Sequence, residues 1–212
     1  MREGLFHSPL YWLSHFGVWL FLKLKYRLKV EGARNIPRTG GAVIVANHCS
    51  YLDPPVMCAV SASRIVRFMA RDTLFYSRFA KWYFNGVRVI ALDRTRGDLG
   101  ALKRAIATLK EGKVIGLFPE GTRSRDGQMH EAKGGIGFLI AKGDVPVVPL
   151  YITGTFQAFP KGSSKFKPSR VVARIGQPIT PEEIHAAMPE KGDYEAVGAL
   201  IMRRIRELSG EA

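Results

Sequence analysis

Apolar residues fall into two patterns along the chain, which are short unbroken runs and longer segments with helical spacing. The unbroken runs predict buried strands, and an alternation of basic and apolar residues at 23–31 predicts an edge strand. Helical spacing, with Asp98 as a cap for one segment, predicts the helices between them. The expected strands are 42–46, 65–70, 87–92, 114–118, 145–152 (interrupted by prolines) and 171–175, and the expected helices are 53–62, 75–84, 98–112, 134–142 and 194–208.

Strands that alternate with helices indicate an α/β fold, with a central, mostly parallel sheet flanked by helices. The 212 residues suit one domain with a short appendage. We place the boundary after residue 29, with an N-terminal helical segment at 1–29 and the main domain at 30–212. The loop at 161–170 (KGSSKFKPSR) is the best candidate for a mobile basic loop.

The N-terminal segment is the most apolar part of the chain. Residues 4–22 contain no Lys, Arg, Asp or Glu, and a basic cluster follows at 23–29. A spanning helix needs about 20 apolar residues, and here polar residues and Pro9 interrupt the run. One spanning helix, two short helices broken at Ser8-Pro9 and near Gly17, and a core helix pair all stay open. We favour a monotopic membrane anchor in one leaflet, with the basic cluster on anionic head groups, and reject a cleaved secretory signal.

The charge balance predicts an anionic partner. Lys and Arg number 32 against 18 Asp and Glu, which gives a formal net charge of +14. Nucleic acid is rejected because the chain lacks a basic recognition helix, zinc-ligand spacing or an RNA-binding signature. Anionic lipid, an acidic substrate or an acidic carrier protein stay open. The two cysteines, Cys49 and Cys58, form neither a disulfide framework nor a metal site, which fits a reducing compartment.

Candidate chemistry follows the run AVIVA at 42–46. His48 comes directly after this strand, where open α/β sheets place their ligands, and Asp53 starts the next helix. A carboxylate that folds back onto the imidazole would leave one ring nitrogen free as a general base. Ser50 or Cys49 as nucleophile is disfavoured, because adjacent side chains diverge. If the reaction forms a negatively charged oxygen (an oxyanion) on the substrate, backbone N–H groups near the His48 turn are expected to bind it.

Three further motifs accompany this pair. FPEGTRS (118–124) follows another buried strand, with Gly121 for close backbone approach and Arg123 as a phosphate ligand. GVRVIALDR (86–94) and VPVVPL (145–150) come before and after it. Each of these motifs, taken alone, also fits a plain strand or a polar turn.

Together, NHCSYLD (47–53) and these three motifs resemble the glycerolipid acyltransferase family, in particular bacterial 1-acyl-glycerol-3-phosphate acyltransferases. The resemblance implies His48 as the catalytic base and Asp53 as its orienting partner. It implies that the remaining site residues bind the acceptor and that no metal or cofactor is needed. Those residues are Arg94, Glu120, Gly121, Thr122, Arg123, Lys133 and Arg71, the last standing where the family often has a lysine.

The resemblance also implies an activity for the acyltransferase domain at 30–212. A fatty acyl group would move from acyl-CoA or acyl carrier protein to the sn-2 hydroxyl of 1-acyl-glycerol-3-phosphate, giving phosphatidic acid at the cytoplasmic face of the inner membrane. One alternative is another acceptor, such as a lyso-ornithine lipid, another lysophospholipid or glycerol-3-phosphate. An alternative of another class is a non-catalytic lipid-binding protein of the membrane surface.

Overall fold

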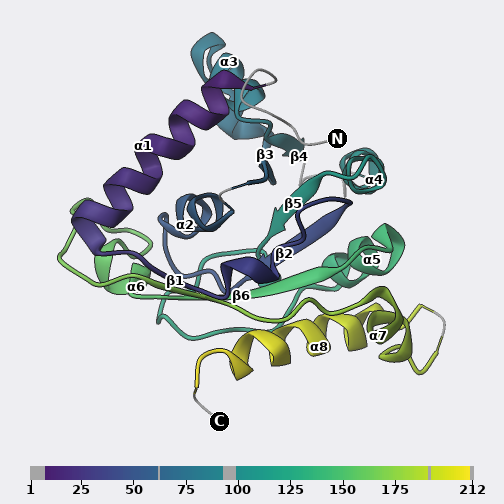
Figure 1. Ribbon diagram of the computed structural model, residues 1–212. Helices are drawn as coiled ribbons and strands as arrows, with labels where there is room; N and C mark the ends of the chain where they lie inside the picture. Colours follow the sequence, from purple (N-terminus) through teal and green to yellow (C-terminus); the bar gives the residue numbers. More distant parts are fainter. Residues whose placement is uncertain (1–7, 62, 93–98, 191, 211–212) are drawn as a thin grey trace.

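The computed structural model describes residues 8–61, 63–92, 99–190 and 192–210 and has a seven-stranded sheet at its centre (Figure 1). The strand order is β1-β7-β6-β2-β5-β3-β4, and every pair is parallel except β6 with β7. The predicted α/β class is therefore confirmed. The strands are β1 (Lys29–Glu31), β2 (Ala42–Ala46), β3 (Val66–Arg71), β4 (Ile90–Leu92), β5 (Val114–Leu117), β6 (Val147–Thr153) and β7 (Val172–Ile175).

Helices cover both faces of the sheet, with one apolar core on each side (Figure 1). Helices α1, α2 and α6 pack on one face, and α4, α5, α7 and α8 pack on the other. The helices are α1 (Pro9–Tyr26), α2 (Asp53–Val60), α3 (Arg78–Gly86), α4 (Leu99–Lys110), α5 (Gly134–Gly143), α6 (Thr155–Ala158), α7 (Pro181–Ala186) and α8 (Tyr194–Glu207), with 3-10 turns η2 (Ala33–Asn35) and η3 (Asp72–Phe75).

The centre of the sheet brings two of the predicted motifs together. Strand β2 lies between β6 and β5, and Val45 pairs with Leu117 in parallel register. Because parallel strands end at the same edge, the residues after Ala46 and after Leu117 meet there. The His48 turn and the 118–124 segment are therefore neighbours.

The described part of the N-terminal segment forms one continuous helix, α1, over Pro9–Tyr26, so the alternative with a break near Gly17 is excluded. A single mid-helix glycine costs only about 1 kcal/mol, and Tyr11, Leu22 and Tyr26 of this helix are buried in contact with the rest of the domain. The helix continues through Lys23 and Lys25, so the strand expected at 23–31 shortens to β1. Among the described residues, no helix combines the length and apolarity needed to cross a bilayer.

Strand β6 is continuous, so the predicted interruption by prolines is also wrong. Pro149 lies within it, and its carbonyl accepts a hydrogen bond from the Gly176 N–H at 2.9 Å. A proline lacks only the donor, so a position that uses its carbonyl tolerates it.

Candidate active site

The turn between β2 and α2 is fixed at its start by Asn47. Its side-chain amide donates to the Ile152 carbonyl at 2.9 Å, and its side-chain carbonyl accepts the Ile152 N–H at 2.8 Å. These two bonds tie the end of β2 to β6 as a further strand residue would. Asn47 therefore sets where the next residue, His48, leaves the sheet.

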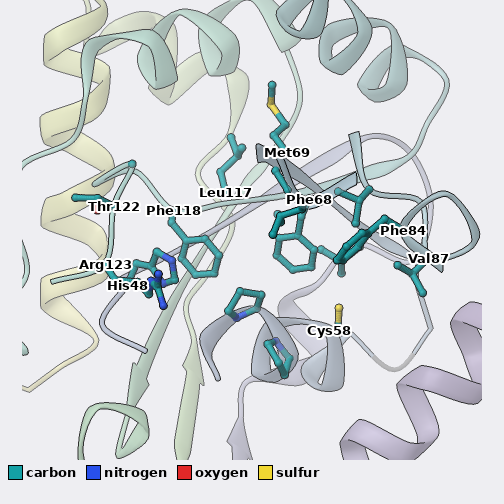
Figure 2. Close-up of a pocket in the computed structure, with 18 of the residues that line it drawn as sticks. His48, Cys58, Phe68, Met69, Phe84, Val87, Leu117, Phe118, Thr122 and Arg123 are labelled. Atoms are coloured by element: carbon teal, nitrogen blue, oxygen red, sulfur yellow. The ribbon is translucent and has the colours of Figure 1, made fainter. Parts of the chain in front are cut away.

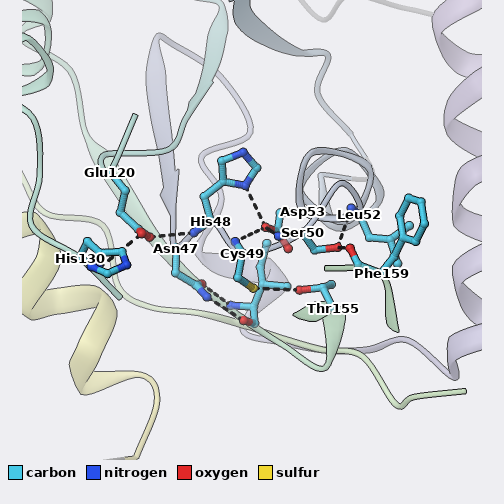
Figure 3. A network of polar contacts seen from close by, with 11 residues as sticks. Asn47, His48, Cys49, Ser50, Leu52, Asp53, Glu120, His130, Thr155 and Phe159 are labelled. Carbon is cyan, nitrogen blue, oxygen red and sulfur yellow. Dashed lines mark hydrogen bonds and ion pairs between the residues drawn. The ribbon is translucent and has the colours of Figure 1, made fainter. Parts of the chain in front are cut away.

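His48 and Asp53 are in direct contact, as the sequence predicts (Figure 3). The Nδ1–H of His48 donates to Asp53 Oδ2 at 2.9 Å, and the Asp53 side chain is fully buried. A carboxylate can only accept, so the ring proton lies on Nδ1 and leaves Nε2 as a free acceptor. This is the tautomer that a general base requires.

The Asp53 carboxylate also holds the turn itself. Its Oδ2 accepts the backbone N–H groups of Cys49 and Ser50, each at 2.7 Å. Asp53 is the first residue of α2, where the helix dipole favours a negative charge. Asp53 therefore both orients the imidazole and shapes the loop that carries it.

Phe118 holds the His48 ring from the other side. The two rings are stacked with centroids 4.0 Å apart and planes 19° apart. Only 15% of the His48 side chain is exposed, and it lines a cavity. Stacking and the Asp53 bond together fix both the position and the rotation of the imidazole.

Glu120 binds the backbone of His48 and does not line the cavity, although the resemblance placed it with the acceptor-binding residues. Its Oε1 accepts the His48 N–H at 2.8 Å, and its Oε2 accepts the His130 N–H at 3.4 Å. The Ser124 N–H donates to the His48 carbonyl at 2.7 Å. Both peptide groups of His48 are thus held by residues of the 118–124 region, which makes Glu120 a positioning residue.

Burial raises the pKa of the Glu120 carboxyl above its usual 4.5, although the two N–H donors oppose this shift. A raised pKa in the folded state means that stability falls as pH rises from the unfolded pKa through the folded one. We therefore expect the melting temperature of Glu120→Gln, relative to that of the wild type, to increase between pH 4.5 and pH 8.

Glu120→Ala leaves the His48 N–H without an acceptor and should lose about 1–3 kcal/mol of stability. Thermal unfolding at several pH values measures both, and a pH-independent difference for Gln would contradict the expectation.

Four backbone N–H groups near His48 already have acceptors. The N–H groups of His48, Cys49 and Ser50 are all bound to carboxylates, and the Leu52 N–H donates to the Ser50 hydroxyl at 3.0 Å. These four groups are therefore not free to act as the oxyanion donors that the sequence suggested. Other donors line the cavity with His48, among them Thr122, Arg123 and Lys133.

Neither Cys49 nor Ser50 is placed to act as a nucleophile. Burial and the nearby Asp53 charge raise the pKa of the Cys49 thiol to about 12, so it stays protonated near neutral pH. The Ser50 hydroxyl is fully buried and donates to the Phe159 carbonyl at 2.6 Å. The imidazole is therefore left to act on a substrate group.

Arg123 lies over the ring of Tyr51, with the guanidinium carbon 3.5 Å from the ring centroid. Its Nη1 is buried and has no hydrogen-bond partner among the described atoms. Gly121, at φ +65°, lies so close to Lys133 that a Cβ there would come within 2.9 Å of its Cδ. Gly121, Arg123 and Lys133 line the cavity with Thr122. In the described part of the chain, neither cation has an ion-pair partner, which suits an anionic ligand.

The whole cavity has a volume of about 840 Å³ and extends from this polar end into an apolar interior (Figure 2). His48, Thr122 and Arg123 lie at one side, and the cavity continues past Phe118 and Phe68 toward Phe84, Val87 and Cys58. Tyr11, His15 and Val18 of α1 also line it. The cationic end of the cavity thus suits an anionic group, and the apolar interior suits a long apolar chain.

The structure brings most of the predicted site residues together. His48, Gly121, Thr122, Arg123 and Lys133 share the cavity, and Asp53 lies directly behind His48. Arg71 ends β3, but its side chain lies outside what the structure describes, as does the whole of Arg94. Lys161 lines the same cavity and was not predicted. The only signal for it in the sequence was the basic loop at 161–170.

Fold and site define an α/β protein with a histidine–aspartate pair at the cationic end of an apolar cavity. The acyltransferase family model matches residues 27–153, and the chain belongs to this family.

Relatives and a solved structure agree with this assignment. The chloroplastic 1-acyl-sn-glycerol-3-phosphate acyltransferase of Arabidopsis thaliana is 35% identical over 141 residues, which cover 65% of this chain but 39% of that protein. The 1-acyl-sn-glycerol-3-phosphate acyltransferase of Bacillus subtilis (strain 168) is 26% identical over 91% of this chain and 93% of its own. The crystal structure of the 1-acyl-sn-glycerophosphate (LPA) acyltransferase PlsC from Thermotoga maritima superposes with a TM-score of 0.77 at 31% identity, covering 96% of this chain and 80% of that one.

Proposed function

We propose that the protein transfers a fatty acyl group from an acyl thioester to the sn-2 hydroxyl of 1-acyl-glycerol-3-phosphate and so forms phosphatidic acid. The observation that carries this proposal is the His48–Asp53 pair at the polar end of an apolar cavity, which it shares with cations that make no ion pair among the described residues. The names of the Arabidopsis, Bacillus and Thermotoga relatives support the same acceptor.

The reaction needs one proton transfer in each direction. Nε2 of His48 takes the proton of the sn-2 hydroxyl while that oxygen forms a bond to the thioester carbonyl carbon. The negatively charged carbonyl oxygen is stabilised by the donors beside His48, which include Thr122 and Lys133. The carbon–sulfur bond then breaks, and the thiolate leaves and takes up the proton from the imidazolium. Asp53 stabilises the imidazolium throughout.

The acceptor's phosphate is held by cations at the polar end of the cavity. Arg123 presents a planar fork of donors, and its unpartnered Nη1 gains a hydrogen bond when an oxyanion binds. Lys133 adds a second charge. We retain Arg71 and Arg94 as proposed contacts on the strength of the family resemblance alone.

The apolar part of the cavity would hold an acyl chain. The whole cavity, at about 840 Å³, lies within the roughly 300–1,000 Å³ common for ligand pockets. Each buried methylene contributes about 0.8 kcal/mol, so chain length should affect turnover strongly.

A larger side chain at Val87 should therefore shift the preference of the enzyme toward shorter acyl chains. Val87 lies at the end of the cavity away from His48 (Figure 2). For Val87→Trp we expect a fall of at least about tenfold in kcat/KM for long-chain thioesters and little change for short ones. A series of acyl donors with matched head groups measures this. Equal losses at all chain lengths would mean that the acyl chain lies elsewhere.

The proposed activity is tested with purified protein, 1-acyl-glycerol-3-phosphate and either acyl-CoA or acyl carrier protein thioester. We expect phosphatidic acid to form, and to form far more slowly from lyso-ornithine lipid or glycerol-3-phosphate. Faster acylation of one of those acceptors would replace the proposed substrate. Binding of the lysolipid without turnover by either donor would favour a non-catalytic lipid-binding protein.

We further propose that the protein lies on the cytoplasmic face of the inner membrane, held there by α1. The outer face of α1 exposes Leu13, Phe16 and Leu24, with exposed fractions of 71%, 58% and 75%. Lys23 and Lys25 lie in its last turn. An apolar helix face with flanking cations is typical of helices that lie in the head-group region of anionic membranes.

A charge on this face should release the protein from membranes. We expect Phe16→Glu to reduce binding to phosphatidylglycerol-containing vesicles about tenfold, because a carboxylate replaces an apolar contact. Leu99→Glu is the matched control, since Leu99 is an exposed apolar residue too, 69% against 58% for Phe16, but lies on α4, away from α1 (Figure 1). Vesicle co-sedimentation measures both variants, and equal losses would exclude α1 as the contact.

A further inference from the structure

Lys161 lines the same cavity as His48 and Arg123, although it lies in the basic loop at 161–170, outside the four motifs. We propose that Lys161 is a specificity-determining residue that binds the acceptor's phosphate and selects a phosphomonoester over a phosphodiester. This inference rests on the proposed function and extends it to the choice of acceptor.

The start of this loop is attached directly to the catalytic turn. Pro160 pairs with Ser50 in an antiparallel bridge, and the Ser50 hydroxyl donates to the Phe159 carbonyl at 2.6 Å. The Ser163 N–H donates to the Pro160 carbonyl at 3.1 Å, which closes a turn around Lys161. Ser50 is two residues from His48, so these bonds fix the backbone of Lys161 relative to the base.

An aromatic row supports the same loop and continues to Arg123. Phe159 packs on Phe166 with ring centroids 4.3 Å apart, and on Tyr51 at 5.4 Å. Tyr51 in turn lies beneath the guanidinium of Arg123 at 3.5 Å. Arg123 and Phe159, the residue before Pro160, therefore belong to one packed unit.

Three separate segments supply the cations of this site. Arg123 comes from the segment after β5, Lys133 from the residue before α5, and Lys161 from the segment after α6. Within the described residues, none of the three makes an ion pair with a carboxylate. Three uncompensated cations around one cavity raise its local potential and favour the most highly charged ligand.

The position of Lys161 fits the acceptor better than the donor. The reacting hydroxyl and the phosphate ester of the acceptor are on neighbouring carbons, so the phosphate stays close to His48 during the reaction. The phosphates of a coenzyme A or carrier-protein thioester are separated from the reacting carbonyl by the length of the pantetheine arm. Cations that share the cavity with the imidazole therefore match the acceptor's phosphate.

Charge explains the expected selectivity. A phosphomonoester carries about −1.5 to −2 at pH 7, because its second pKa is about 6, whereas a phosphodiester carries a single charge. A third cation in the site therefore strengthens the binding of a doubly charged phosphate more than that of a singly charged one. Without Lys161, the two remaining cations would discriminate less between the two classes of acceptor.

The test compares Lys161→Ala with wild type, using 1-acyl-glycerol-3-phosphate and lysophosphatidylglycerol as acceptors at pH 7.5. We expect the KM for the monoester to rise about tenfold, equivalent to the loss of one charge-assisted contact, with kcat nearly unchanged. The KM for the diester should change less than threefold, and Lys161→Arg should keep most of the monoester preference. Lys165→Ala is the matched control, because Lys165 is an exposed lysine of the same loop that does not line the cavity.

Several outcomes would overturn this assignment. An unchanged monoester KM, an equal rise for both acceptors, or the same effect in Lys165→Ala would each remove Lys161 from the phosphate site. A rise confined to the KM of the thioester donor would assign Lys161 to the donor's phosphates. Failure of the wild-type protein to acylate either acceptor would instead count against the proposed function. The wild-type rate therefore distinguishes this failure from that of the Lys161 assignment.

Discussion

His48→Ala should lower kcat for acyl transfer by about 10²–10⁴-fold, the usual contribution of a general base. The imidazole is the group whose free nitrogen faces the cavity, and no neighbouring side chain can replace it, since the Cys49 thiol stays protonated and the Ser50 hydroxyl is bound elsewhere. The acceptor KM should change little, because the cations that hold the phosphate remain. Initial rates with 1-acyl-glycerol-3-phosphate measure both parameters.

The fold of this variant should survive. The His48 side chain makes one hydrogen bond, and Asp53 retains its two backbone donors when the ring is removed. His185→Ala is a suitable control, since His185 lies on α7 and pairs with Asp144 on the protein surface. Wild-type turnover in His48→Ala, with an unchanged melting temperature, would exclude the general-base mechanism.

The contact between His48 and Asp53 could be predicted from the sequence because both residues lie in one strand–turn–helix segment. The run AVIVA is apolar enough to be a buried strand, and β2 has the predicted bounds, Ala42–Ala46. His48 follows at the strand's carboxyl end, and five residues of separation let Asp53 fold back within the same turn. The sequence order of strand, turn and helix start therefore suffices to predict the contact, although residues distant in the sequence, such as Glu120 and Phe118, also hold His48 in place.

Contacts that depend on tertiary structure could not be predicted in this way. Glu120 reaches the His48 N–H across 72 residues, and nothing in FPEGTRS distinguishes a carboxylate that binds a backbone from one that binds a substrate. Lys161 is one of several lysines in its loop, and only the pairing of Pro160 with Ser50 brings it to the cavity. Both assignments required the sheet order and the loop packing.

Helix α7 is a different case, because its signal was present in the sequence. Thr180 and Glu183 form a capping box, in which each side chain accepts the other residue's backbone N–H. Thr-x-x-Glu with a proline in the first turn is a typical helix start. The helix has only six residues, so the apolar periodicity used for the longer helices could not reveal it.

Asp53 is expected to affect both catalysis and stability, whereas the sequence alone suggests a catalytic role. Asp53→Asn keeps an oxygen that can take the place of Oδ2, which accepts the His48 Nδ1–H and the Cys49 and Ser50 N–H groups alike. What the variant loses is the negative charge that stabilises the imidazolium. A neighbouring opposite charge shifts a pKa by about 1–3 units, so we expect Asn to lower kcat about 10- to 10³-fold, with a modest change in melting temperature.

Asp53→Ala should lower stability as well as kcat, because it leaves two buried N–H groups, those of Cys49 and Ser50, without acceptors. Each unsatisfied donor costs about 1–3 kcal/mol, so the free energy of unfolding should fall by several kcal/mol. Denaturant unfolding together with initial rates separates the two roles. If Ala is as stable as Asn, the carboxylate does not hold the turn. If Asn keeps wild-type kcat, the charge of Asp53 does not stabilise the imidazolium, and the role of Asp53 is limited to holding the ring and the turn.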